Sequence, residues 1–179
     1  MTPLAAPLQI GLALLVVVAA VFDVRERRIP NWLTSSGAVA GLVIHFVKSG
    51  WQGLKFAVLG LGLAFLIYLA LFALRAAGGG DVKLMAAIGA LSGASNWLVI
   101  FVFASVLGGV AAIVLALVKG RLRQTLRNVV RIIRELGAGR APYARHPDLD
   151  VASPGALRLP YGAVIAAGTL AYLLASSTV

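Results

Sequence analysis

Long apolar runs with very few charged residues restrict the fold of this sequence more than any other feature. The first run covers residues 4–22, and similar runs cover 32–47, 54–74, 97–118 and 159–175. About 20 apolar residues are enough for an α-helix to cross a bilayer. Only 12% of all residues are charged, against about 25% in a typical soluble domain. The sequence therefore predicts an all-α membrane protein rather than a soluble domain.

The apolar stretch at residues 82–118 is too long for a single span, and its middle favours a break. Residues 92–96, Ser-Gly-Ala-Ser-Asn, are typical of a turn. We therefore expect a short helix at 82–91 before the full span at 97–118. If the short helix did not cross, the basic segment 119–145 would face outward, against the positive-inside rule. The expected fold has six transmembrane helices with both termini outside.

This topology also accounts for the positive charge of the chain. The sequence contains 16 Lys and Arg against 6 Asp and Glu, a formal net charge of +10. Only Lys48 and Lys55 are expected outside, and every other basic residue lies at the cytoplasmic side, so the charge requires no nucleic-acid partner. The absence of cysteine excludes disulfides, thiol nucleophiles and Cys-ligated zinc.

One further helix, at residues 119–136, is expected on the membrane surface rather than across it. Its apolar and basic residues recur on opposite sides, which is typical of an amphipathic helix on an anionic lipid surface. A polar cytoplasmic loop follows at 137–154. We therefore predict a single domain over residues 1–179, in which 119–154 is the cytoplasmic part. The apolar side carries Leu122, Leu126, Val129, Val130, Ile133 and Leu136, and the basic side carries Arg123, Arg127, Arg131 and Arg134.

Two of the six acidic residues differ from the others in their position. Asp23 directly follows the first apolar run and Asp81 directly precedes the short helix, so the expected topology returns both to the cytoplasmic face. Ionisable groups at membrane depth are costly and are typically functional. Two structural roles stay open: Asp23 as a helix-end charge paired with Arg27, and Asp81 as a helix N-cap. The remaining acidic residues are expected to be solvated or, for Glu26, to form a surface ion pair.

The sequence next to each aspartate departs from an ordinary helix end. Three glycines precede Asp81, and glycine permits unusual backbone angles and the close approach of another chain. Such a backbone suits a site that admits an extended peptide. After Asp23, Pro30 ends the helix, because proline disfavours helical geometry at the residue before it.

These motifs resemble those of the type IV prepilin peptidases, a family of GxGD-type intramembrane aspartic peptidases. Residues 23–31, Asp-Val-Arg-Glu-Arg-Arg-Ile-Pro-Asn, resemble the first aspartate motif of the family. Residues 78–84, Gly-Gly-Gly-Asp-Val-Lys-Leu, resemble its Gly-x-Gly-Asp motif. Leu-Pro-Tyr-Gly at 159–162, followed by an apolar span, resembles its C-terminal segment. The resemblance covers essentially the whole chain.

The resemblance implies a catalytic pair, Asp23 and Asp81, and a reaction. Two neighbouring carboxylates share one proton, so that one activates water while the other polarises the scissile carbonyl, with no metal or other cofactor. The implied substrate is a prepilin with a short basic leader, cut after a glycine just before its apolar helix. A Glu near the mature N-terminus of such substrates suggests a basic partner in the enzyme. The residues expected to bind substrate are Gly78, Gly80, Lys83 and Arg25.

The resemblance also narrows the subfamily and the location. Longer members carry an N-terminal segment with paired cysteines and also N-methylate the mature pilin. This chain begins at its first span and contains no cysteine, so it resembles the short, peptidase-only members found with Flp (tight adherence) pili. We expect a multi-pass protein of the bacterial inner membrane with its site on the cytoplasmic side. Its expected partners are a prepilin or pseudopilin, membrane lipid and pilus assembly proteins.

Other classes of function remain open from the residues alone. A small proton- or cation-coupled transporter would use the same two aspartates as ion ligands, although transporters commonly place such groups near the midplane and contain internal repeats. A non-catalytic scaffold would use the amphipathic helix and leave the glycine-rich aspartate motif unexplained. A Mg²⁺ site at the two aspartates would lack further oxygen ligands nearby.

Overall fold

The structure is a computed structural model that describes residues 4–139 and 159–177, and throughout these two ranges the regular elements are helices. Three of them, α1, α2 and α3, are each long and apolar enough to cross a membrane, and α6 is a shorter apolar helix. The expected all-helical, membrane-spanning architecture is confirmed to this extent. The helices are α1 (Ala6–Glu26), α2 (Asn31–Ala73), α3 (Gly79–Val118), α4 (Leu122–Gly137) and α6 (Tyr161–Ser177).

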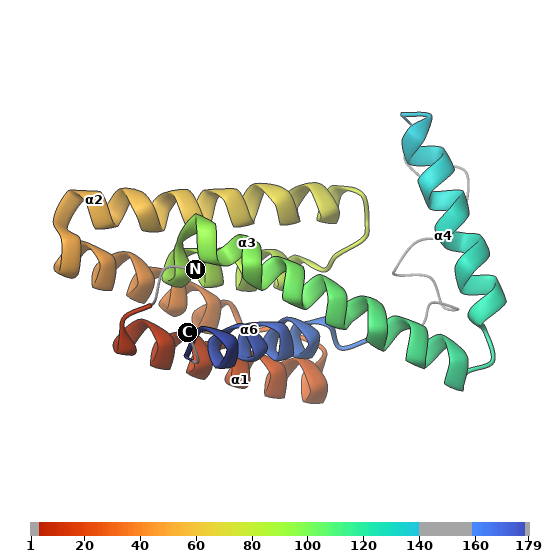
Figure 1. Ribbon diagram of the computed structural model, residues 1–179, viewed down its shortest axis with the longest axis horizontal. Coiled ribbons are helices and arrows are strands. Elements are labelled where there is room, and N and C mark those ends of the chain that lie inside the picture. The colour runs from red at the N-terminus through yellow and green to blue at the C-terminus, as the bar shows by residue number, and fades with distance from the viewer. Residues whose placement is uncertain (1–3, 140–158, 178–179) are drawn as a thin grey trace.

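Helices α2 and α3 are each interrupted once by non-helical backbone. The interruption lies at Ser49 and Gly50 in α2 and at Gly93 in α3. Gly50 has a φ of 55° and Gly93 a φ of 75°, which glycine adopts without steric cost. Figure 1 shows each helix turning back on itself at its interruption. The break expected at residues 92–96 is therefore confirmed, and α2 breaks between its two apolar runs.

A buried histidine supports the break in α3. Nε2 of His45 lies 3.1 Å from the carbonyl oxygen of Leu91, one of the last carbonyls before Gly93, and such carbonyls lack partners within their own helix. The ring of Phe56 packs edge-on against His45 at a centroid distance of 5.4 Å. The same ring occupies the space that a Cβ on Gly93 would need. His45 thus has a structural role, and Gly93 is required by both its φ and its neighbours.

Helices cross at points where small residues let their backbones touch. A methyl group on Gly60 of α2 would overlap the carbonyl oxygen of Gly89 in α3, and one on Gly89 would overlap that of Gly60. Lipid provides no hydrophobic driving force between helices, so close packing of small residues has to hold them together. Two further crossings are built alike, Gly41 of α2 against Ala90 and Gly168 of α6 against Ala104.

The first part of α3 is the centre of the bundle, and the outer helix faces are apolar. Residues 84–93 are all buried, whereas Leu14, Leu66 and Val106 are each exposed by 60% or more. Exposed apolar side chains in such number are compatible with lipid and not with water. Figure 1 shows α1 ending, and α2, α3 and α6 beginning, towards the same end of the bundle.

Some element boundaries differ from those expected. Helix α3 begins at Gly79 rather than at 82, so Asp81 lies inside its first turn. Helix α4 begins at Leu122 rather than at 119, because Gly120, with a φ of 65°, follows the end of α3. The expected loop at 137–154 lies outside the described residues from position 140 onward.

Gly60→Ala is expected to lower the unfolding temperature, because the new methyl group would force α2 and α3 apart at a cost of about 1–3 kcal/mol. Gly62→Ala is the matched control on the same helix: no atom lies within 4 Å of its Cβ position. Alanine there is the better helix former by about 1 kcal/mol. Thermal unfolding in detergent micelles measures both variants, and equal unfolding temperatures would contradict this packing.

Candidate active site

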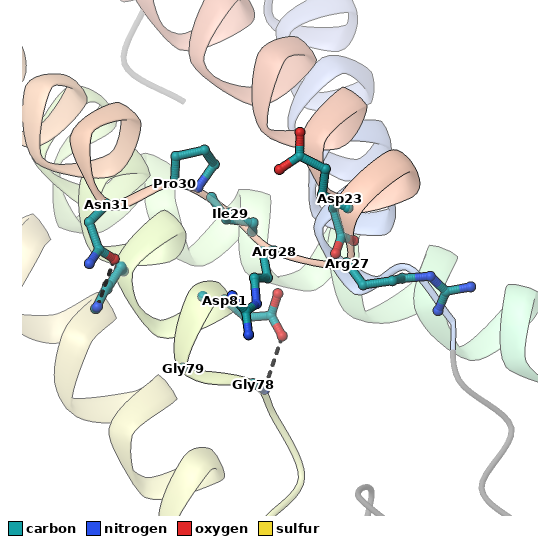
Figure 2. A pocket seen from close by; sticks show the side chains of 12 residues that line it. Asp23, Arg27, Arg28, Ile29, Pro30, Asn31, Gly78, Gly79 and Asp81 are labelled. Carbon is teal, nitrogen blue, oxygen red and sulfur yellow. Dashed lines mark hydrogen bonds between the residues drawn. The ribbon is translucent and has the colours of Figure 1, made fainter.

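A cleft opens at the end of the bundle where α1 ends and α3 begins. Its volume is about 540 Å³, and it is lined by the last turn of α1, the α1–α2 loop and the first residues of α3. Asp23 and Asp81 both line it. Figure 2 shows Asp81 beside the loop that runs from Arg27 to Asn31 and Asp23 on the neighbouring helix. The structure thus brings the two aspartates singled out by the sequence into one cleft.

Asp23 is tied to a third helix, α6. The side chain is only 9% exposed, and its Oδ2 accepts a hydrogen bond of 2.8 Å from the backbone N–H of Gly162. Gly162 is the second residue of α6, where amides lack helical partners and the helix dipole favours a negative charge. A Cβ on Gly162 would lie 3.0 Å from both Cβ and Oδ2 of Asp23. Only glycine therefore leaves Asp23 in this position without a shift of one of the two.

Asp81 is the third residue of α3, and its side chain binds back to the backbone at the start of the same helix. Its Oδ2 accepts a hydrogen bond of 3.0 Å from the backbone N–H of Gly78, the residue that precedes the first helical one. This is one half of a capping box, so the N-cap itself is Gly78 and not Asp81. Gly78 has φ −83° and ψ 155°, which other residues also adopt. A Cβ there would lie 3.2 Å from Oδ2 of Asp81, so this glycine provides space for the carboxylate.

Of the residues expected to bind substrate, the structure places three in the cleft and one outside it. Gly80 and Lys83 line the cleft together with Gly78, and Nζ of Lys83 donates a hydrogen bond of 2.8 Å to Oδ1 of Asn31, which joins α3 to the start of α2 (Figure 2). Arg25 is exposed on the last turn of α1 and does not line the cleft.

Each aspartate keeps one carboxylate oxygen uncommitted. Asp23 and Asp81 each use Oδ2 for a backbone amide, and within residues 4–139 and 159–177 no further hydrogen bond or ion pair to either carboxylate occurs. The same two ranges contain no group of three or more His, Asp or Glu side chains placed to hold a metal ion. The arrangement can therefore offer two carboxylate oxygens to water and to a carbonyl group across one cleft.

Some residues of this site were not predicted from the sequence. Glu26, Arg27 and Arg28 also line the cleft, and Gly162 holds Asp23. The signal for Gly162 was its place at the start of a helix, where free amides seek an acceptor. Its partner, however, lies on a helix far away in the sequence, and only the folded chain identifies it.

The fold and the cleft define a multi-span membrane protein with an aspartate pair at one end of its helix bundle. A model of the type IV leader peptidase family matches residues 10–113, which is more than half of the chain and includes both aspartates. The chain therefore belongs to this peptidase family, and the resemblance of its motifs is confirmed. The comparisons with curated proteins and with solved structures each gave no significant match.

Gly162→Ala is expected to slow leader-peptide cleavage about tenfold or more, because Asp23 would have to move and lose a hydrogen bond to its charged form. Gly109→Ala is the control, since nothing lies within 4 Å of a Cβ at that helical position. Initial rates of cleavage by equal amounts of folded protein measure the effect. Wild-type rates in G162A would show that this contact does not position Asp23.

Proposed function

We propose that this protein is a membrane aspartic endopeptidase that removes the leader peptide from type IV prepilins of the Flp type. The observation that carries the proposal is the single cleft shared by Asp23 and Asp81, in the region that matches the leader peptidase family. Neither aspartate needs to contact the other at rest, because catalytic contacts often tighten only when substrate binds.

The proposed chemistry uses the two uncommitted carboxylate oxygens. The ionised member of the pair takes a proton from water while the protonated member donates a hydrogen bond to the scissile carbonyl. Water then attacks the carbonyl carbon, and the proton held by the first carboxylate passes to the leaving amine. The backbone N–H of Gly162 and that of Gly78 hold the two carboxylates, so that little reorganisation is needed during the reaction.

The proposed topology has six membrane crossings and puts the cleft at the cytoplasmic face of the bacterial inner membrane. The two parts of α2 and of α3 supply four crossings, and α1 and α6 supply the other two. Arg27 and Arg28 line the cleft, and α4 follows from the same side with its own arginines exposed. The positive-inside rule supports this orientation.

Substrate binding is proposed at the glycines and at Lys83. Gly78 and Gly80 form an edge of the cleft with no side chains, which leaves room for an extended peptide. Lys83 is exposed beside them, and its ammonium group has donors left after the bond to Asn31. We propose that Lys83 forms an ion pair with a Glu near the mature N-terminus of the prepilin. Arg25 attracts the same group from a greater distance and more weakly.

The exposed apolar face of α4 supports the proposal that membrane lipid is a further partner. Leu126, Val129 and Ile133 are all exposed, and Figure 1 shows α4 running steeply across the direction of α3 at the end of that helix. An exposed apolar face with arginines beside it suits an anionic lipid surface. Pilus assembly proteins are proposed as additional partners of this cytoplasmic part.

Asp23→Asn and Asp81→Asn are each expected to abolish cleavage, because an amide can neither take the proton from water nor share one with the other carboxylate. Glu26→Gln is the matched control: it removes a carboxylate from the same cleft and should leave most of the activity. Co-expression with an Flp-type prepilin, followed by its mass shift on a gel, measures all three variants.

Full activity of D23N or D81N would refute the aspartate mechanism. If the wild-type protein cleaved none of several prepilins, the leader peptidase proposal would fail. Ion transport through the same two aspartates would then be the function to test.

Lys83→Glu is expected to slow the processing of a prepilin with Glu near its mature N-terminus about fivefold to tenfold, because attraction is replaced by repulsion. A prepilin with Lys in place of that Glu should recover the loss. Arg25→Glu, outside the cleft lining, is the control and should have a smaller effect. If the charge-exchanged pair is no faster than K83E with the original prepilin, Lys83 does not bind this group.

A further inference from the structure

The first turn of α6 is held by few hydrogen bonds of its own. The amides of Ala163 and Val164 reach the carbonyl oxygen of Pro160 at 3.1 and 3.4 Å. The amide of Gly162 donates to Asp23 on α1 instead. Helix starts lack the full set of intrahelical bonds and open more easily than helix centres. The position of Gly162 therefore depends on how side chains pack around this turn.

Tyr161, the residue before Gly162, packs against α3 at a position that has no side chain. A Cβ on Gly108 would lie 3.3 Å from Cε2 of Tyr161 and 3.6 Å from its hydroxyl oxygen. The same Cβ would lie 3.3 Å from Cγ1 of Val164, one turn further along α6. Gly108 is buried, and its lack of a side chain lets the first turn of α6 lie directly on α3.

The far end of the Tyr161 side chain reaches α2. Its hydroxyl lies beside that of Tyr68, a residue of the second part of α2 that is 1% exposed. The ring of Tyr68 packs edge-on against Trp97 at a centroid distance of 6.4 Å and against Phe101 at 6.1 Å. Such arrangements are favourable for aromatic pairs. Tyr161 thus extends from the start of α6 along Gly108 to a tightly packed part of the bundle.

The contact between Gly162 and Asp23 leaves little tolerance for a shift of this turn. The hydrogen bond is 2.8 Å long and buried, and a Cβ on Gly162 would already lie 3.0 Å from two atoms of Asp23. A misplacement of about 1 Å at a catalytic group costs about a hundredfold in rate. Whatever fixes the first turn of α6 therefore also fixes the carboxylate of Asp23.

We propose that Tyr161 is a positioning residue: its ring, packed on Gly108, fixes the first turn of α6 so that the N–H of Gly162 meets Asp23. This inference rests on the proposed peptidase function. Tyr161 does not line the cleft and acts through Gly162. The second part of α3 thereby orients an aspartate of α1, with α6 between them. Helix α6 lies outside residues 10–113, which the family model matches.

The test compares three single variants of α6. Tyr161→Ala removes the ring, and Tyr161→Phe keeps the ring and removes the hydroxyl. Val164→Ala is the matched control, because it removes packing at the same Gly108 without touching the residue next to Gly162. The purified full chain in detergent micelles is assayed for kcat, KM and Tm with an Flp-type prepilin.

Y161A is expected to lower kcat about tenfold, with KM changed by less than about twofold because Tyr161 lies outside the cleft. Y161F should stay within about twofold of the wild-type kcat, since the ring does the positioning. Both Y161A and V164A lose packing and should have a lower Tm, but V164A should keep its kcat.

Combining Y161A with Gly162→Ala separates positioning from general loss of packing. If Tyr161 acts through the bond from Gly162, the double variant should be no slower than the slower of the two single ones. Independent effects would multiply instead, to a loss of about a hundredfold.

Gly108→Ala replaces Y161A if that variant does not fold. The new methyl group would push the Tyr161 ring by a few tenths of an ångström and should lower kcat about threefold. Gly109→Ala is its control, because nothing lies within 4 Å of a Cβ at that neighbouring position. Equal kcat in these two variants would overturn the inference.

Four further results would overturn it. Wild-type kcat in Y161A would show that the ring does not position Asp23, and an equal loss in Y161F would assign the effect to the hydroxyl. An equal loss of kcat in V164A, or multiplied losses in the double variant, would assign the effect to packing alone. A wild-type protein that cleaves no prepilin would instead refute the proposed function, and the inference with it.

Discussion

Backbone amides at helix starts lack partners within their own helix, and in this protein two aspartates accept hydrogen bonds from them. Gly162 at the start of α6 donates to Asp23, and Gly78 just before α3 donates to Asp81. An amide without a partner is costly where water is excluded, which applies to the buried bond from Gly162 and not to the exposed bond from Gly78. The end of α1 is thereby held to the start of α6, and the cleft lies between this end of α1 and the start of α3.

The structural role of the aspartates and the catalytic role proposed for them are compatible because they use different atoms. One oxygen of each carboxylate is held by an amide, which orients the group, and the second oxygen remains available. Glycine is required on the amide side for the same reason, since a Cβ on Gly162 or Gly78 would lie 3.0 or 3.2 Å from the carboxylate it serves. An aspartate that accepts from a helix-start amide is thus also held in a fixed orientation, as the proposed acid and base require.

Local patterns predicted the local features of this fold, and tertiary pairing accounts for what they missed. The break near Gly93 and the end of α1 before Pro30 follow from turn residues, and the grouping of Asp23 with Asp81 follows from counting spans. The start of α3 was misplaced because the side chain of Asp81 extends the helix back to Gly79. No periodicity indicates that α6 begins against Asp23, or that Arg25 is absent from the lining of a cleft to which Asp23 and Arg27 belong.

The first part of α3 is shorter than the hydrocarbon core of a bilayer is thick. Residues 79–92 rise about 20 Å, whereas the hydrocarbon core is about 30 Å thick. With Gly93 at the outer boundary, as in the proposed topology, the floor of the cleft lies about 10 Å beneath the cytoplasmic headgroups. Protein rather than lipid surrounds this segment, because residues 84–93 are all buried. In the proposed topology the cleft is therefore a depression in the protein surface that both water and the polar leader of the proposed substrate have to enter, and its depth below the headgroups changes with bilayer thickness.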